Sequence, residues 1–115
     1  MLAWNDQLRA AGFRTAILSN LPRPLGEELY RVPRFFDRFD HLTLSYELRM
    51  VKPEAGIYRH AVEGVGVDPA EALFLDDKAV NVDGARAVGL PTELFTTWEE
   101  FVESGAAEKR GLPRP

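Results

Sequence analysis

The chain has 115 residues, of which 45% are hydrophobic and 28% are charged, and its formal net charge is −4. This is the composition of one soluble globular domain; the acidic balance argues against a nucleic-acid-binding protein, and the absence of cysteine excludes disulfides and thiolate metal sites. No apolar stretch approaches the roughly 20 residues of a membrane span, and no signal-peptide pattern opens the chain, so we expect a cytoplasmic protein without a membrane partner.

The first half of the chain alternates helical patterns with short apolar runs. Trp4, Leu8 and Ala11 share one face of a helix that Gly12 ends. A phenylalanine-rich segment, 35–39, is irregular, and we expect it to pack beneath a loop. In chain order, the predicted elements are a helix over residues 2–11, a strand over 14–18, a brief helix over 25–31 and a strand over 41–44.

The second half continues this alternation. Ile57, Ala61 and Val65 form an apolar stripe on a helix that begins at Pro53, a residue suited to a first helical turn. The later predicted elements are a single helical turn capped by Asp68, a strand over 72–75, a helix over 78–88, a strand over 92–95 and a helix capped by Thr97 that ends at 104. The alternation predicts an α/β fold with a parallel sheet, in one domain over 1–104 followed by a surface tail over 105–115.

Polar side chains follow two of the predicted strands where each strand ends. Ser19 and Asn20 follow the first strand, and the adjacent carboxylates of Asp76 and Asp77 follow the third. Ligands of parallel α/β sheets bind beyond the carboxyl ends of the strands, and paired carboxylates are tolerated where a cation lies between them. Together with Lys52, these residues are most of the parts of a Mg²⁺-dependent phosphoryl-transfer site.

Each candidate residue also has a simpler structural interpretation. Ser19 and Asn20 suit a strand-end turn, and Lys52 suits a solvated surface position. The Asp76–Asp77 pair suits the start of the following helix, because the helix dipole favours carboxylates there. Taken one at a time, the residues favour these interpretations, whereas their order and spacing together favour a site.

Three segments carry a family resemblance: ILSN at 17–20, VKP at 51–53, and FLDD at 74–77 followed by NVDGARAVG at 81–89. In this order they resemble the haloacid dehalogenase-like hydrolases, most of which are phosphatases, and in particular the subfamily with a helical cap near the amino terminus. The likeness spans roughly residues 8–101. It implies a three-layer α/β/α, Rossmann-like fold and Mg²⁺-dependent hydrolysis of a small phosphorylated molecule.

The resemblance also implies a role for each candidate residue. Lys52 would neutralise charge on the phosphoryl group and on the nucleophile, and Asp77 would bind Mg²⁺ directly or through water. The residues expected to be catalytic are Ser19, Asn20 and Lys52, and those expected at the metal are Asp76, Asp77 and Asn81.

The nucleophile of this family is absent from the sequence. Family members begin with a strand that ends in Asp-x-Asp; the first carboxylate attacks phosphorus and the second transfers protons. No predicted strand carries that motif here, and the cap is absent too. In the family, the missing strand lies between the strands that end at Ser19 and Asp76. We therefore expect a carboxyl-terminal core fragment of a longer phosphatase, without turnover on its own.

The missing strand leaves alternatives open. The two flanking strands pair directly, a second copy or another polypeptide donates a strand, or the longer protein supplies it. The non-enzymatic alternative is a binding or assembly module that keeps the pocket and forms a homodimer, or a complex with a complementing chain, through its exposed strands. A phosphoacceptor receiver domain is disfavoured because its acidic pair comes first in the chain. A hydrolytic dehalogenase is disfavoured because Asp76 and Asp77 are both retained.

Overall fold

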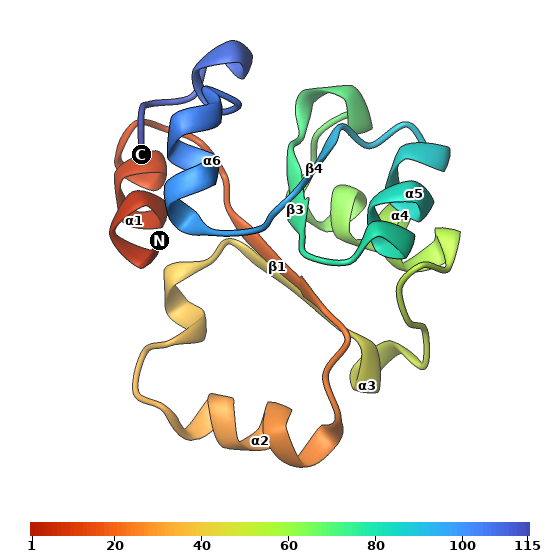
Figure 1. The fold of residues 1–115 in the computed structure, drawn as a ribbon. Helices are drawn as coiled ribbons and strands as arrows, with labels where there is room; N and C mark the ends of the chain where they lie inside the picture. Colours follow the sequence, from red (N-terminus) through yellow and green to blue (C-terminus); the bar gives the residue numbers. More distant parts are fainter.

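Four short parallel strands form the centre of the molecule as two separate pairs (Figure 1). The computed structural model describes residues 1–115. The strands are β1 (Ala16–Ser19), β2 (His41–Leu44), β3 (Phe74–Asp76) and β4 (Thr92–Leu94). β1 pairs with β2, with Ser19 opposite Leu44, and β3 pairs with β4, with Asp76 opposite Leu94. Because the pairs are not hydrogen-bonded to each other, β1 and β3 each keep one edge without a neighbouring strand.

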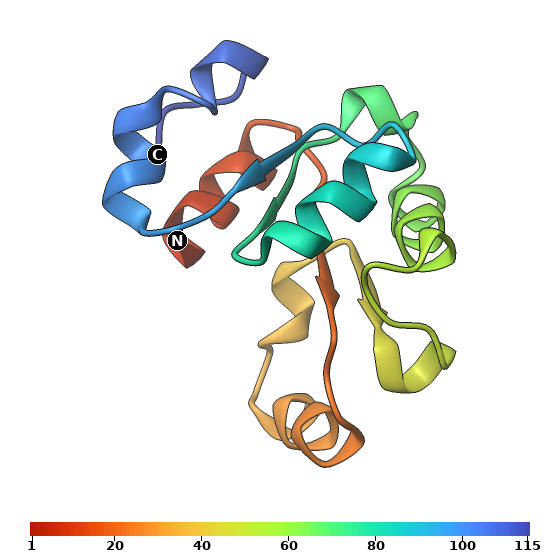
Figure 2. The same cartoon turned by 45° about the vertical axis from the view of Figure 1, so that its right-hand side comes forward.

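Helices cover the strands on both sides, which gives the expected three-layer α/β/α, Rossmann-like arrangement. The helices are α1 (Leu2–Ala10), α2 (Arg23–Arg31), α3 (Ser45–Leu48), α4 (Ala55–Val65), α5 (Ala79–Ala87) and α6 (Trp98–Ser104). α1 and α6 lie together on one side, and α4 and α5 lie on the other (Figures 1 and 2). None of these helices has the length and apolar character needed to cross a bilayer.

The helix ends follow from local chemistry that the sequence predicted in part. The hydroxyl of Thr97 accepts a hydrogen bond of 3.1 Å from the Glu100 N–H and begins α6, as its capping signature predicted. The carboxylate of Glu71 accepts a hydrogen bond of 3.3 Å from the Asp68 N–H, so the second signature opens a single turn, as expected. α4 ends at Gly66, whose φ of +81° lies in the left-handed region that favours glycine.

The prediction that Pro53 lies in the first turn of a helix was wrong. α4 begins at Ala55, and Glu54 occupies its N-cap position. The Glu54 N–H donates to the Val51 carbonyl at 2.8 Å, and its carboxylate accepts from the Val51 N–H at 3.2 Å. Residues 51–54 therefore form a hydrogen-bonded turn that holds Pro53 outside the helix. The sequence also did not predict α3, which has only four residues and no helical periodicity of its own.

The last eleven residues, expected as a tail, pack onto the amino-terminal helix. Ala106 and Ala107 are buried against Trp4 in one core cluster, and Leu112 packs against the same cluster. The Trp4 indole N–H also donates to the Pro113 carbonyl at 3.0 Å. A short turn at Glu108–Arg110 joins these contacts. The segment is thus anchored at both of its ends.

The apolar core is divided, and β1 and β3 are incompletely covered. One cluster lies around α1 and α6, and the other around α4 and α5. Leu44 in β2 is fully buried, whereas Leu18 in β1 and Phe74 in β3 are half-buried. The accessible surface of 7011 Å² exceeds the roughly 6,300 Å² expected for a folded monomer of this mass. The excess agrees with a sheet whose middle is open.

Candidate functional site

Lys52 and Asp76 form a buried ion pair at the carboxyl end of β3. The Lys52 ammonium lies 2.6 Å from Asp76 Oδ2, and the two side chains are only 11% and 3% exposed. Lys52 comes from the turn before α4, and the pair therefore joins segments 24 residues apart in sequence. A lysine this deeply buried needs a partner, because an unpaired charge away from water is costly. Lys52 is thus a buried, paired cation and not a solvated surface residue.

Both carboxylate oxygens of Asp76 are fully engaged by hydrogen-bond donors. Oδ1 accepts from the Lys78 N–H at 2.9 Å, and the Asn81 amide donates to both oxygens at 3.3 Å. Burial alone would raise the pKa of Asp76, but the hydrogen bonds from Lys52 and the Lys78 N–H outweigh it and hold the pKa below its usual value. Asp76 is therefore a charged anchor that positions Lys52.

Asn20, immediately after β1, holds the backbone of Lys52. Its amide donates to the Lys52 carbonyl at 3.1 Å, and its side-chain oxygen accepts from the Lys52 N–H at 2.8 Å. These reciprocal bonds tie the end of β1 to the turn that carries the lysine. The cluster thus collects side chains from after β1, from before α4, from the end of β3 and from α5, where Asn81 lies.

Two residues that the sequence did not mark as functional support this cluster. Tyr58 in α4 is fully buried, and its hydroxyl donates to the Asn81 carbonyl at 2.7 Å. Burial and, secondarily, the charge of Asp76 raise the pKa of Tyr58 to about 12. Gly84 in α5 allows a close approach to the lysine turn, since a Cβ there would lie 2.6 Å from Pro53 Cβ. Tyr58 lies beside the apolar stripe of its helix, so only this long-range contact distinguishes it from a core residue.

Ser19 and Asp77 lie apart from this hydrogen-bonded network. Ser19 is half-buried at the end of β1, and Asp77 is exposed after β3. No third metal-ligating side chain joins Asp76 and Asp77. Asp77 has a free carboxylate suited to a hard cation, whereas the oxygens of Asp76 are already occupied. The residues present therefore fit part of a Mg²⁺ site, with Asp77 as the carboxylate that is free to bind the ion.

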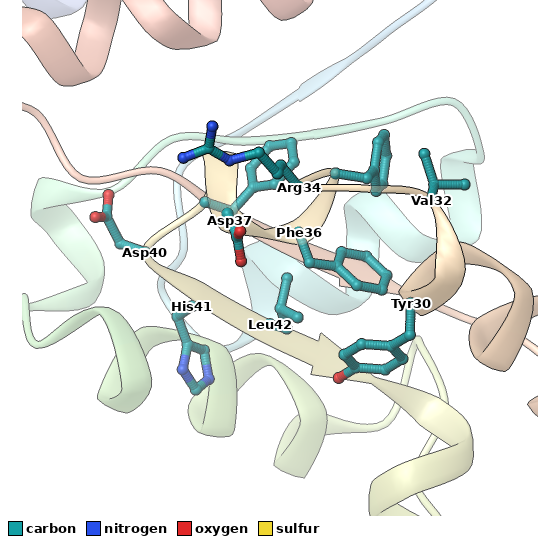
Figure 3. Close-up of a pocket in the computed structure, with 10 residues that line it drawn as sticks. Tyr30, Val32, Arg34, Phe36, Asp37, Asp40, His41 and Leu42 are labelled. Atoms are coloured by element: carbon teal, nitrogen blue, oxygen red, sulfur yellow. The ribbon is translucent and has the colours of Figure 1, made fainter.

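Another groove lies elsewhere, along β2 and the segment that precedes it. It has a volume of about 610 Å³, and its apolar wall includes Tyr30, Phe36 and Leu42 (Figure 3). Phe36 packs edge-on against Tyr30 of α2 with ring centroids 4.6 Å apart, so the phenylalanine-rich segment packs against that helix and lines a groove. None of the candidate site residues lines this groove.

The two histidines occupy structural positions. The His60 Nδ1 lies 3.1 Å from the Thr43 hydroxyl, and the ring of His41 packs 5.5 Å from that of His60. The His41 ring fills the space that a Cβ on Gly64 would need. Burial, and secondarily the His60 ring, lower the pKa of His41 below its usual value. Neither histidine contacts the Lys52–Asp76 pair.

The fold and this cluster define a Rossmann-like α/β domain with a charged, hydrogen-bonded site at the carboxyl ends of its strands. A family model described as haloacid dehalogenase-like hydrolase matches residues 3–89. The chain therefore belongs to the haloacid dehalogenase-like hydrolase family, as its motifs indicated.

Curated relatives include phosphatases and dehalogenases. The sesquiterpene phosphatase astK of Aspergillus oryzae is 32% identical over 73% of this chain and 43% of its own length. A phosphoglycolate phosphatase of Cupriavidus necator is 33% identical over 73% of this chain and 36% of its own length. An (S)-2-haloacid dehalogenase of Pseudomonas is 33% identical over 74% of this chain and 37% of its own length. The chain thus spans about two fifths of the length of these relatives.

Solved structures share the arrangement. An uncharacterized protein from Corynebacterium glutamicum superimposes with a TM-score of 0.77 at 30% identity, over 96% of this chain and 82% of that one. A HAD family enzyme from Bacteroides thetaiotaomicron superimposes with a TM-score of 0.72 at 29% identity, over 87% of this chain and 55% of that one. That protein is an Asp-to-Ala mutant crystallised with magnesium and inorganic phosphate. These matches confirm the α/β/α fold at the level of the whole chain.

Proposed function

We propose that this chain is the carboxyl-terminal part of the core of a Mg²⁺-dependent phosphatase that hydrolyses a small phosphate monoester through an aspartyl-phosphate. The observation that carries the proposal is the fixation of Lys52. Its ammonium is held by Asp76 and its backbone by Asn20, at the carboxyl ends of two strands that each keep a free edge. A parallel strand between these edges would bring its own carboxyl end to Lys52.

The proposed reaction uses a carboxylate on that absent strand. Its oxygen attacks phosphorus and the P–O bond to the alcohol breaks, while the second carboxylic acid of the Asp-x-Asp motif gives its proton to the leaving alcohol. That second carboxylate then takes a proton from water, which hydrolyses the acyl phosphate, releases inorganic phosphate and restores the first carboxylate. Lys52 stabilises the negative charge of the phosphoryl oxygens, and Ser19 and Asn20 donate hydrogen bonds to them. Asp77 supplies a carboxylate ligand for Mg²⁺, which when bound neutralises charge on the phosphoryl group.

The remaining site residues act by positioning. Asp76 orients the Lys52 ammonium, and Asn81 fixes the carboxylate of Asp76 through its amide. Support for phosphate chemistry comes from the relatives, two of which are phosphatases by name, and from the Bacteroides enzyme crystallised with magnesium and phosphate. The retained pair of carboxylates favours a phosphatase over a dehalogenase.

The size and activity of the protein in cells that produce it test this proposal. An antibody against the chain captures it for intact-mass measurement and for an assay with an aryl phosphate. We expect a mass well above 12.9 kDa, an Asp-x-Asp strand upstream, and hydrolysis that requires Mg²⁺. A mass of 12.9 kDa for the captured protein would contradict the proposal of a longer enzyme.

A second candidate function is a non-catalytic binding or assembly module that keeps the pocket. Its support is the pair of free strand edges on β1 and β3 and the incomplete burial of both strands. Such edges pair readily with another strand, in a homodimer or in a complex with a complementing chain. Sedimentation velocity without Mg²⁺ tests this function, and a strictly monomeric chain at high concentration would contradict it.

A further inference from the structure

A groove of about 420 Å³ adjoins the turn that carries Lys52. It is lined by residues 20–22 after β1, by Ser45, Tyr46 and Arg49 around α3, and by Val51. Asn20 connects the groove to the Lys52 turn. It lines the groove, and its side chain forms hydrogen bonds of 2.8 Å with the Lys52 N–H and of 3.1 Å with the Lys52 carbonyl. A molecule bound near Lys52 therefore has this groove next to it.

The walls of the groove are fixed by specific contacts. The Ser45 hydroxyl accepts from the Leu21 N–H at 2.8 Å and donates to the Leu21 carbonyl at 3.2 Å, which locks the two loops together. The ring of Tyr46 rests against Gly26 in α2, where a Cβ would lie only 2.1 Å from Tyr46 Cε1. A groove with such fixed walls is preorganised for a ligand.

Arg49 supplies the groove with an unpaired charge. It is exposed and forms no salt bridge, whereas the neighbouring Arg23 already pairs with Glu27 at 3.7 Å and stacks over Tyr46 at 5.2 Å. Arg49 ends α3 with a φ of +56°, a conformation in which glycine is the least strained residue. Arg49 therefore presents to this groove an exposed guanidinium that no carboxylate of the chain pairs with.

We propose that this groove binds the organic part of the substrate and that Arg49 recognises a second anion on it, a carboxylate. The inference rests on the proposed function, because it requires the phosphoryl group to lie at Lys52 and Asn20. A guanidinium binds a carboxylate through two parallel hydrogen bonds, which suits a planar acid on a short linker. Leu21, Tyr46 and Val51 provide apolar surface for that linker. The substrate class is a small phosphorylated carboxylic acid.

Two non-hydrolysable probes separate the groove from the phosphoryl site. Methylphosphonate carries only the phosphoryl-like group, and phosphonoacetate adds a carboxylate; each is titrated into the ¹⁵N-labelled chain and followed by NMR. We expect both probes to shift the amides of Asn20 and Lys52, and only phosphonoacetate to shift those of Tyr46 and Arg49. We expect phosphonoacetate to bind at least fivefold more tightly.

The variant Arg49→Gln should abolish the difference in affinity between the two probes. Arg34→Gln is the matched control, because Arg34 is also exposed, has a φ of +60° and lies outside this groove. Three outcomes would overturn the groove inference but leave the proposed phosphoryl site standing. They are equal affinities of the unmodified chain for the two probes, an affinity difference that survives Arg49→Gln, and an affinity difference that both variants abolish. Titrations in which neither probe shifts Asn20 or Lys52 would contradict the phosphoryl site and the groove together.

Discussion

The ammonium of Lys52 lies 2.6 Å from Asp76 Oδ2, and both side chains are almost completely withdrawn from solvent. This contact joins the turn before α4 to the end of β3. It therefore helps to link the two strand pairs near the carboxyl ends of β1 and β3. Asn20 completes the link from the β1 side. The same contacts that hold the divided sheet together therefore also place the cation.

Breaking this pair from one side should destabilise the chain strongly. Asp76→Asn leaves a buried ammonium without its counter-charge, and we expect a loss of about 3–5 kcal/mol in the free energy of unfolding. Urea titration followed by circular dichroism measures it. Asp77→Asn is the matched control, because Asp77 is exposed; it should change stability by less than about 0.5 kcal/mol. Equal effects of the two variants would contradict the anchoring role of Asp76.

The lowered pKa of Asp76 predicts a loss of stability in acid. Its pKa in the folded chain lies below the value of 3.8 for a free side chain, so its stabilising contribution is complete above 3.8 and is lost as the pH falls through the lowered pKa. Carboxyl carbon NMR of the folded chain measures the titration directly. A folded-state midpoint at or above 3.8 would show that burial, which raises the pKa, outweighs the hydrogen bonds.

A methyl group at position 84 should displace the lysine turn. Gly84→Ala would bring a Cβ to 2.6 Å from Pro53 Cβ and 2.9 Å from the Pro53 carbonyl oxygen, so one segment must move. We expect a loss of about 1–3 kcal/mol, together with changes in the amide resonances of Asn20 and Lys52. Asp83→Ala, on the exposed side of the same helix, is the control. Unchanged Asn20 and Lys52 resonances in Gly84→Ala would refute the proposed contact.

The carboxyl-terminal segment should contribute to stability even though it lies outside the predicted domain. Removing residues 105–115 uncovers the core cluster beneath Ala106 and Ala107 and deletes the acceptor for the Trp4 indole. We expect a cooperative loss of stability and a change in Trp fluorescence. A shorter truncation, of residues 113–115, deletes the acceptor for the Trp4 indole but keeps Ala106 and Ala107, and the lost hydrogen bond should cost about 0.5–1.5 kcal/mol. An unaltered melting curve after the longer truncation would support a domain that ends at 104.

Much of the fold was predictable because most of its elements have strong periodic patterns or caps. The strand that ends at Ser19 and the capped helix that begins after Thr97 were found within one or two residues of their bounds. The single turn of α3 was not, because four residues are too few to show a helical period. The packing of Ala106 and Ala107 depends on contacts with Trp4, about a hundred residues away, which no local pattern reveals.

The sequence predicted several residues that the structure joins by hydrogen bonds, but not how they are arranged. The order of the motifs predicted Lys52, Asp76 and Asn81 as site residues. In the structure, Asp76 is hydrogen-bonded to both of the others. The different environments of the two adjacent carboxylates were not predictable from the Asp76–Asp77 pair alone. Only the fold shows that one of them is buried against Lys52 and that the other is free.

Turnover by the pure chain tests whether these residues serve a nucleophile that this sequence does not contain. The assay follows hydrolysis of p-nitrophenyl phosphate with and without Mg²⁺, in parallel for the unmodified chain and Asp77→Asn. We expect that neither protein exceeds the buffer rate. Robust Mg²⁺-dependent hydrolysis that Asp77→Asn abolishes would contradict it, because the chain would then hold a complete catalytic site.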